Sequence, residues 1–211
     1  MRHLIYLHGF LSSPKSHKAI VTKKYLSEHH PGIKFHCPHL SSKPRQDWHL
    51  LRRVVRQLSL QGATDNRKEC SSQIGVIGSS LGGFWASSLL STYGESTNYR
   101  MRACLINPAV HPHRLLQDRI DQSLDYWHVG GGIKLRRCDL LALQSLANRC
   151  CGQALSAELC QVFVQTGDET LDYTEAVSYY ARAKVHIEQG GSHAFDDYVA
   201  HLPSLLAYLF K

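Results

Sequence analysis

The run Ile74-Gly75-Val76-Ile77-Gly78-Ser79-Ser80-Leu81-Gly82 joins an apolar strand to a tight turn, and Phe84-Trp85-Ala86-Ser87-Ser88-Leu89-Leu90 continues it as a helix. In a Gly-x-Ser-x-Gly turn of this kind the serine stands exposed at the carboxyl edge of a sheet. Glycine suits both ends of the turn because a side chain there would collide with neighbouring backbone. Ser80 is therefore a candidate nucleophile. The alternative is a turn that merely connects a strand to a helix.

A nucleophilic serine needs a base to take its proton and an acid to orient that base. In this strand–turn–helix arrangement the acid and then the histidine follow the serine in the chain, each after a later strand. Residues 161–165 and 184–187 have the pattern of such strands. Asp168 follows the first of them, and His193 lies in the glycine-containing loop after the second. We expect Ser80, His193 and Asp168 to meet at one edge of the sheet.

Three acidic residues compete for the role of the acid: Asp168, Glu169 and Asp172. Asp168 is preferred because it comes directly after Gly167 at the end of a predicted strand. Asp172 is better placed to cap the helix that follows. The sequence thus favours Asp168 and leaves the other two open.

The negative oxygen formed when a serine attacks a carbonyl needs two N–H donors, together called an oxyanion hole. One donor is expected to be the backbone N–H of Leu81, the residue after the nucleophile. The other is expected in the loop after an earlier strand. Leu4-Ile5-Tyr6-Leu7 predicts that strand, and His8-Gly9-Phe10 follows it. We assign the second donor to the N–H of Phe10, because Gly9 lets the loop approach the site closely.

Five separated motifs resemble those of the bacterial YqiA-like esterases, and the resemblance runs nearly from end to end. The motifs lie at residues 5–14, 78–83, 107–110, 166–173 and 190–195. The resemblance implies a small α/β-hydrolase with esterase and acyl-thioester hydrolase activity. Between Pro112 and Leu159 little of the resemblance is found, so the acyl group and the choice between ester and thioester are not indicated.

Strand and helix patterns alternate along the chain, which is typical of a parallel sheet flanked by helices. We expect an α/β-hydrolase fold with a reduced, mainly parallel sheet of about six strands. The predicted strands are 4–7, 33–37, 74–78, 103–106, 161–165 and 184–188. The predicted helices are 14–28, capped by Ser13, 47–60, 81–93, 173–182 and 195–210, the last kinked or divided at Pro203.

One connection is too long for a single crossover helix. The chain of 211 residues suits a single domain over residues 1–211, and within it residues 108–159 separate two neighbouring predicted strands. We expect helical pieces at 115–124 and 139–148. Long connections inside compact domains are more often functional than idle, so this insertion is interpreted as a small helical lid over Ser80. The alternative is a pair of helices packed on the sheet.

Composition excludes several other classes of protein. The formal charge is +7, but the basic residues are scattered and no nucleic-acid-binding motif is present. No apolar run approaches the ~18 residues of a membrane span, and we expect a soluble cytoplasmic protein. Seven cysteines without a spaced framework agree with a reducing compartment: Cys37, Cys70, Cys104, Cys138, Cys150, Cys151 and Cys160. We predict neither a metal nor an organic cofactor. The oligomeric state is not indicated.

The sequence therefore predicts a serine hydrolase acting on a small-molecule acyl ester or thioester. Ser80 would attack the carbonyl, His193 would take its proton, and Asp168 would stabilise the charged imidazole. The alternative is a non-catalytic member of the same fold that binds a ligand or a protein partner, because a fold does not fix a function.

Overall fold

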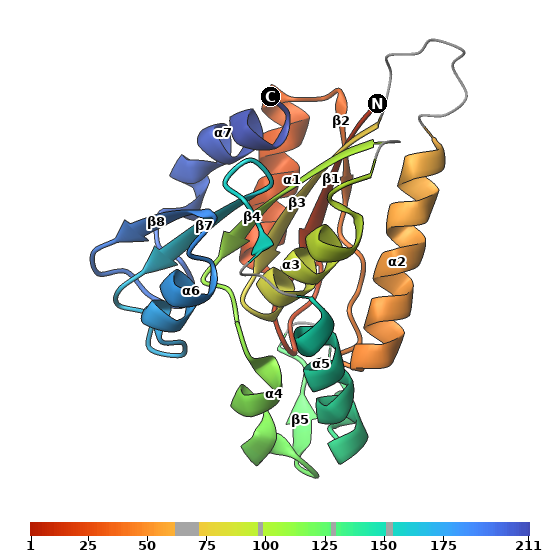
Figure 1. Ribbon diagram of the computed structural model, residues 1–211, viewed down its shortest axis with the longest axis vertical. Helices are drawn as coiled ribbons and strands as arrows, with labels where there is room; N and C mark the ends of the chain where they lie inside the picture. The colour runs from red at the N-terminus through yellow and green to blue at the C-terminus, as the bar shows by residue number, and fades with distance from the viewer. Residues whose placement is uncertain (62–71, 97–98, 128–129, 151–153) are drawn as a thin grey trace.

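The computed structural model describes residues 1–61, 72–96, 99–127, 130–150 and 154–211, and its centre is a six-stranded sheet (Figure 1). The strand order is β2-β1-β3-β4-β7-β8, and every neighbouring pair is parallel. The strands are β1 (Arg2–Leu7), β2 (Ile33–His36), β3 (Ser72–Ser79), β4 (Tyr99–Ile106), β7 (Cys160–Gln165) and β8 (Lys184–Glu188). The parallel six-stranded sheet expected from the sequence is confirmed.

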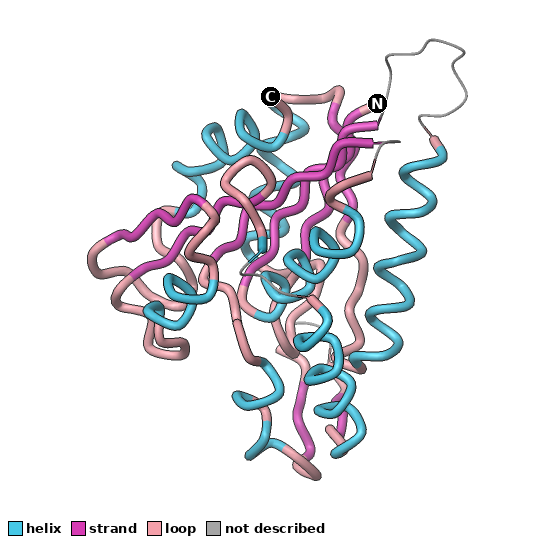
Figure 2. The backbone as a smooth tube through the Cα atoms, viewed as in Figure 1, coloured by secondary structure: helices cyan, strands magenta, loops and turns pink. Residues whose placement is uncertain are grey.

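Helices lie on both sides of the sheet (Figure 2). Two of them, α1 (His17–His29) and α7 (Tyr198–Leu209), pack on one face with strand residues such as Leu4 and Ile106. The other face is covered by α2 (Pro44–Leu60), α3 (Leu81–Tyr93), α5 (Arg137–Arg149) and α6 (Tyr173–Tyr179). Because both faces of the sheet are covered, its inner strands are mostly buried apolar runs, whereas the edge strands β2 and β8 alternate and are more exposed.

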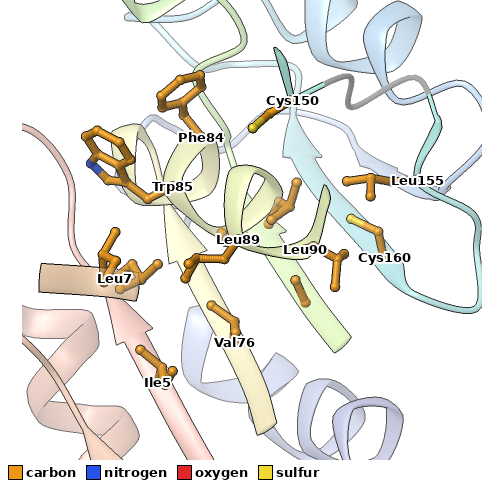
Figure 3. Packing of buried hydrophobic residues seen from close by; sticks show 14 of the residues in the cluster. Ile5, Leu7, Val76, Phe84, Trp85, Leu89, Leu90, Cys150, Leu155 and Cys160 are labelled. Carbon is orange, nitrogen blue, oxygen red and sulfur yellow. The ribbon is translucent and has the colours of Figure 1, made fainter. Parts of the chain in front are cut away.

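Helix α3 is the most deeply buried helix and carries the turn at Ser80 on its N-terminal end. Every residue from Leu81 to Leu90 is buried, which fits a helix that is apolar around its whole circumference. Figure 3 shows Leu89 and Leu90 beside Val76 of β3, with Cys150 and Leu155 of the insertion close to the same helix. The N-terminus of α3 is thus fixed by packing on several sides.

The strand order places a topological switch point at the carboxyl ends of β1 and β3. The two strands are neighbours, with β2 beyond β1 and β4 beyond β3, so the connections that leave them run toward opposite edges of the sheet. Open parallel sheets bind their ligands outside the carboxyl ends of the strands at such a switch point. The loop with Phe10 leaves β1 here, and the turn with Ser80 leaves β3.

The insertion between β4 and β7 extends beyond the carboxyl ends of the strands (Figure 1). It contains α4 (Pro112–Leu115), a 3₁₀ turn at Gln117–Arg119, a small antiparallel hairpin of β5 (Ser123–Asp125) and β6 (Gly132–Lys134), and α5. The helical piece predicted at 139–148 is confirmed. The one predicted at 115–124 is wrong, because this stretch holds the end of α4, the 3₁₀ turn and the first strand of the hairpin.

Two details of the predicted helices are also corrected. Helix α1 begins at His17 with Ser16 at its N-cap, whereas the Ser13 hydroxyl accepts a hydrogen bond from the N–H of Lys15 at 3.1 Å. Helix α7 runs undivided from Tyr198 to Leu209 with Pro203 inside it. Among the described residues, no helix combines the length and the apolar character needed to cross a membrane.

Candidate active site

The turn at Ser80 is sharp, and the two glycines of its motif are required by its shape. Ser80 has φ 57° and ψ −122°, a conformation that residues other than glycine rarely adopt. A Cβ on Gly78 would lie 2.2 Å from the carbonyl oxygen of Gly82, and one on Gly82 would lie 1.9 Å from that of Leu7. The N–H of Ser80 donates to the carbonyl of Ile106 at 3.0 Å. The Ser80 side chain is thereby directed out of the sheet edge.

The structure brings Ser80, His193 and Asp168 together from three separate loops. The Nε2 atom of His193 lies 3.1 Å from Oγ of Ser80. On the other side of the ring, Nδ1 lies 2.8 Å from Oδ2 and 3.0 Å from Oδ1 of Asp168. The loops that carry Asp168 and His193 follow β7 and β8, which are neighbours in the sheet. The serine, the imidazole and the carboxylate thus form one continuous chain of hydrogen bonds.

The surroundings of Asp168 favour its ionised form. Its side chain is only 2% exposed, and burial by itself would raise its pKa. The hydrogen bond from His193 and the N–H groups of Leu171 and Thr170, both 2.8 Å from Oδ1, outweigh burial and hold the pKa below its ordinary value. A carboxylate accepts hydrogen bonds only, so Nδ1 of His193 must carry a proton. Nε2 is then free to accept the proton of Ser80.

The rival acids lie elsewhere. The Glu169 carboxylate is exposed and accepts the backbone N–H of His193 at 2.9 Å, so it holds the loop and not the ring. Asp172 accepts the N–H of Thr174 at 2.8 Å and caps α6. Of the three acidic residues, only Asp168 contacts the imidazole of His193. Its catalytic role stays a prediction.

The two backbone N–H groups expected as oxyanion-hole donors, those of Leu81 and Phe10, belong to segments next to Ser80. Within the described residues, neither the N–H of Leu81 nor that of Phe10 donates to another protein group. Gly9 packs directly on the nucleophile, because a Cβ there would lie 3.3 Å from Cβ and 3.6 Å from Oγ of Ser80. Neither group therefore has a protein acceptor among the described residues. That they form an oxyanion hole stays a prediction.

His8 supports the loop that holds Phe10. Its ring is 1% exposed; Nδ1 donates to the carbonyl of Gly9 at 3.0 Å, and Nε2 accepts the N–H of Leu40 at 3.1 Å. In a trans peptide the carbonyl and the following N–H point in opposite directions. By holding the carbonyl of Gly9, His8 fixes the direction of the N–H of Phe10.

The insertion contacts the same loop. The N–H of Trp127 donates to the carbonyl of Leu11 at 3.0 Å, and the hydroxyl of Tyr126 donates to the carbonyl of Ser41. Leu11 also packs in a small apolar cluster with Leu124 and Leu135 of the insertion. The insertion therefore lies next to the expected oxyanion hole. That it acts as a lid stays a prediction.

Side chains far apart in the sequence hold the loop of His193, and the sequence motifs did not reveal them. Lys18 of α1 donates from Nζ to the carbonyl of Ala194 at 2.6 Å. Burial lowers the pKa of this ammonium group, while the nearby Asp168 opposes the shift. No local spacing links Lys18 or Glu169 to the loop, so only the folded chain shows them as contacts. The described residues form no cluster of three or more His, Cys, Asp or Glu side chains suited to a metal ion.

The sequence matches a protein family over nearly its whole length. A family model described as "Uncharacterised protein family (UPF0227)" matches residues 3–210. A UPF0227 protein of Shewanella sp. (strain ANA-3) is 24% identical over 212 residues, which cover 97% of this chain and 98% of that protein. The match extends almost from one end of the chain to the other, as the resemblance to the YqiA-like proteins predicts.

Solved structures share the fold at low sequence identity. Est1E from Butyrivibrio proteoclasticus superposes with a TM-score of 0.69 at 15% identity, over 100% of this chain and 89% of that one. The alpha/beta hydrolase domain-containing protein 10 from mouse superposes with a TM-score of 0.63 at 12% identity, over 98% of this chain and 90% of that one. The α/β-hydrolase fold predicted from the sequence is confirmed.

Proposed function

The chain belongs to the UPF0227 family, and from that premise we propose that it is a serine hydrolase of carboxylic esters, with acyl thioesters as possible further substrates. The observation that carries the proposal is the position of His193. One ring nitrogen faces the Ser80 hydroxyl at 3.1 Å, and the other faces the Asp168 carboxylate at 2.8 Å. Both distances are within hydrogen-bond reach. The first allows a proton to pass from serine to histidine, and the second lets the carboxylate orient the ring.

The first step forms an acyl-enzyme. Oγ of Ser80 attacks the carbonyl carbon of the ester while Nε2 of His193 takes the hydroxyl proton. The negative charge that develops on the carbonyl oxygen is stabilised by the N–H groups of Phe10 and Leu81. The intermediate collapses as the C–O bond to the alcohol breaks, and His193 returns the proton to the departing oxygen. Asp168 stabilises the charged imidazole throughout.

The second step releases the acid. A water molecule takes the place of the alcohol and gives its proton to Nε2 of His193 as its oxygen attacks the acyl carbon. Collapse of this second intermediate breaks the bond to Oγ of Ser80, which recovers its proton from the ring. In a thioester the departing atom is sulfur, and the same residues perform the same transfers. In this proposal His193 performs each proton transfer, and the N–H groups of Phe10 and Leu81 stabilise the negative oxygen of both intermediates.

Replacement of the nucleophile tests the proposal. Ser80→Ala is expected to lower kcat for p-nitrophenyl butyrate by about 10³-fold or more, because the attacking atom is lost. Ser79→Ala is the matched control, since it makes the same change at the neighbouring serine, which ends β3. Circular dichroism checks that both variants are folded. Full activity in Ser80→Ala would show that Ser80 is not the nucleophile. No hydrolysis of any ester or acyl-CoA thioester by the wild type would favour the ligand-binding alternative.

A further inference from the structure

The loop that carries His193 has no regular structure of its own. Residues 189–197 lie between β8 and α7. Four of them have a positive φ: Gly190 at 76°, Gly191 at 74°, Phe195 at 61° and Asp197 at 54°. Such a backbone is not held by a helix or strand ladder and is costly for residues other than glycine. Within the loop, the N–H of Phe195 donates to the carbonyl of Ser192 and the Ser192 hydroxyl donates to Asp196. The position of His193 depends further on contacts from other segments.

Gln165, the last residue of β7, supplies several of these contacts. Its side-chain oxygen Oε1 accepts the N–H of Ser192 at 3.1 Å and that of Asp196 at 2.8 Å. Its nitrogen Nε2 donates to the carbonyl of Asp196 at 3.1 Å and to Oε2 of Glu188 at 3.0 Å. An amide has two donor hydrogens and two acceptor positions, so this side chain is fully paired. Gln165 is 4% exposed and spans the loop on both sides of His193.

Asn107, the residue after β4, makes a second set of contacts. Its nitrogen Nδ2 donates to the carbonyls of Ser192 at 3.0 Å and of His193 at 3.4 Å. Its oxygen Oδ1 accepts the backbone N–H of Gln165 at 3.0 Å, which links Asn107 to the end of β7. Asn107 is 2% exposed and has φ 40°, a value that asparagine tolerates better than most residues. Loss of either amide would remove the partners of partly buried backbone groups of the loop.

The same end of β4 also holds the nucleophile. The carbonyl of Ile106 accepts the N–H of Ser80 at 3.0 Å, and the next residue, Asn107, holds the carbonyls of Ser192 and His193. Two consecutive residues thus fix both partners of the 3.1 Å contact between Ser80 and His193. The loop is shaped to receive the amides, since a Cβ on Gly191 would lie 2.1 Å from Oε1 of Gln165.

We propose that Asn107 and Gln165, which we name the amide clamp, are positioning residues that set the imidazole of His193 against Ser80. The inference rests on the proposed function, because its effect on turnover requires that His193 serves Ser80. The clamp's hydrogen bonds to the loop go to its backbone and not to the ring of His193, so the clamp acts through the backbone of the loop. A displacement of about 1 Å of a catalytic group costs on the order of 100-fold in rate, so the clamp affects kcat more than KM.

The test replaces one amide by a carboxylate of the same shape. In Gln165→Glu, the new carboxylate still accepts the N–H groups of Ser192 and Asp196. Its second oxygen, however, faces the carbonyl of Asp196 and the carboxylate of Glu188, and these acceptors repel it. The Glu188 carboxylate also lies 3.1 Å from Nε2 of His201. We expect kcat for p-nitrophenyl butyrate to fall about 10- to 100-fold, with KM within about twofold. Gln161→Glu makes the same change on the same strand, where the side chain contacts His186, and is expected to keep at least half of the activity.

Rescue separates positioning from general damage. Adding Glu188→Gln to the Gln165→Glu variant returns an N–H donor opposite the new carboxylate, and we expect kcat to rise at least about fivefold over the single variant. If Gln165→Glu fails to fold, Asn107→Asp is the second variant. It retains the acceptor for the N–H of Gln165 but loses the donor to Ser192 and His193, and the same loss of kcat is expected. Wild-type kcat in a folded Gln165→Glu or Asn107→Asp variant would overturn the proposal.

A spectroscopic measurement distinguishes failure of the clamp from failure of the proposed function. The proton on Nδ1 of His193, bound to the Asp168 carboxylate, is expected as a downfield resonance in proton NMR that His193→Ala removes. Gln165→Glu is expected to broaden or shift this resonance, and Gln161→Glu to leave it unchanged, whether or not the protein hydrolyses esters. An unchanged resonance in Gln165→Glu overturns the clamp. A wild type that shows the resonance but hydrolyses no ester or thioester contradicts only the proposed function.

Discussion

The backbone at Ser80 is held in a strained conformation by close approach of neighbouring chain segments. The 1.9 Å that would separate a Cβ on Gly82 from the carbonyl of Leu7 leaves no room for a methyl group. Strained conformations persist only where the surrounding structure holds them. Here the buried helix α3 on one side and β1 on the other provide that restraint.

Gly82→Ala is therefore expected to lower the free energy of unfolding by about 3 kcal/mol, because either the turn or β1 must move. Urea denaturation measures the change. Gly32→Ala is the matched control, since no atom lies within 4 Å of a Cβ added there. Equal stability of the two variants would show that the turn does not need glycine.

The acid can be identified by single substitutions. Asp168→Asn is expected to lower kcat by about 10⁴-fold, because an amide can no longer stabilise the charged imidazole and selects the wrong tautomer. Asp172→Asn should leave kcat within about twofold, since asparagine caps a helix about as well as aspartate. Ester hydrolysis at saturating substrate measures both. A larger loss of kcat in Asp172→Asn than in Asp168→Asn would show that Asp168 is not the acid.

At the scale of elements, a buried histidine between β1 and the edge strand β2 couples folding to pH. His3 is 0% exposed, and its Nδ1 lies 3.1 Å from Nε2 of His36. Burial, together with the charges of His36, Lys34 and the N-terminus, lowers the pKa of His3 from 6.5 to about 4. The folded protein thus keeps this ring neutral over a range in which the unfolded chain takes up a proton.

The sign of the effect follows from that difference. The stability linked to His3 is fully present above pH 6.5 and is lost as the pH falls to about 4. The loss amounts to about 3 kcal/mol, from ~1.4 kcal/mol per unit of pKa. We expect His3→Phe to show a weaker dependence of unfolding free energy on pH in this range. Urea denaturation at several pH values measures it, and parallel pH profiles for wild type and variant would contradict the assignment.

The strands of the sheet could be predicted from sequence, and the insertion only in part. Each predicted sheet strand lies on an observed one. The inner strands are mostly buried apolar runs, and the edge strands β2 and β8 are short alternating segments. The hairpin of β5 and β6 has only three residues in each strand. Three residues are too few for a pattern of period two to be told from a helical turn. Helix α5 spans thirteen residues with a buried apolar stripe, and its pattern was clear.

At the scale of the whole molecule, chain order was enough to predict that Ser80, Asp168 and His193 meet, because each follows a strand of one parallel sheet. The amide clamp was not predicted. In the sequence, Asn107 is part of the motif at residues 107–110, and Gln165 ends the predicted strand 161–165. Their role depends on which side chains face the loop of His193 once β4, β7 and β8 are neighbours. No spacing in the sequence encodes that contact.

Reaction with a fluorophosphonate tests the central claim most directly, because this reagent labels a serine only when a neighbouring base has activated it. Mass spectrometry of the labelled protein, followed by peptide mapping, locates the modified residue. We expect one adduct, on Ser80, in the wild type, and labelling slower by about 10³-fold in His193→Ala. An unlabelled wild type, an adduct on another serine, or equal labelling of His193→Ala would contradict the account.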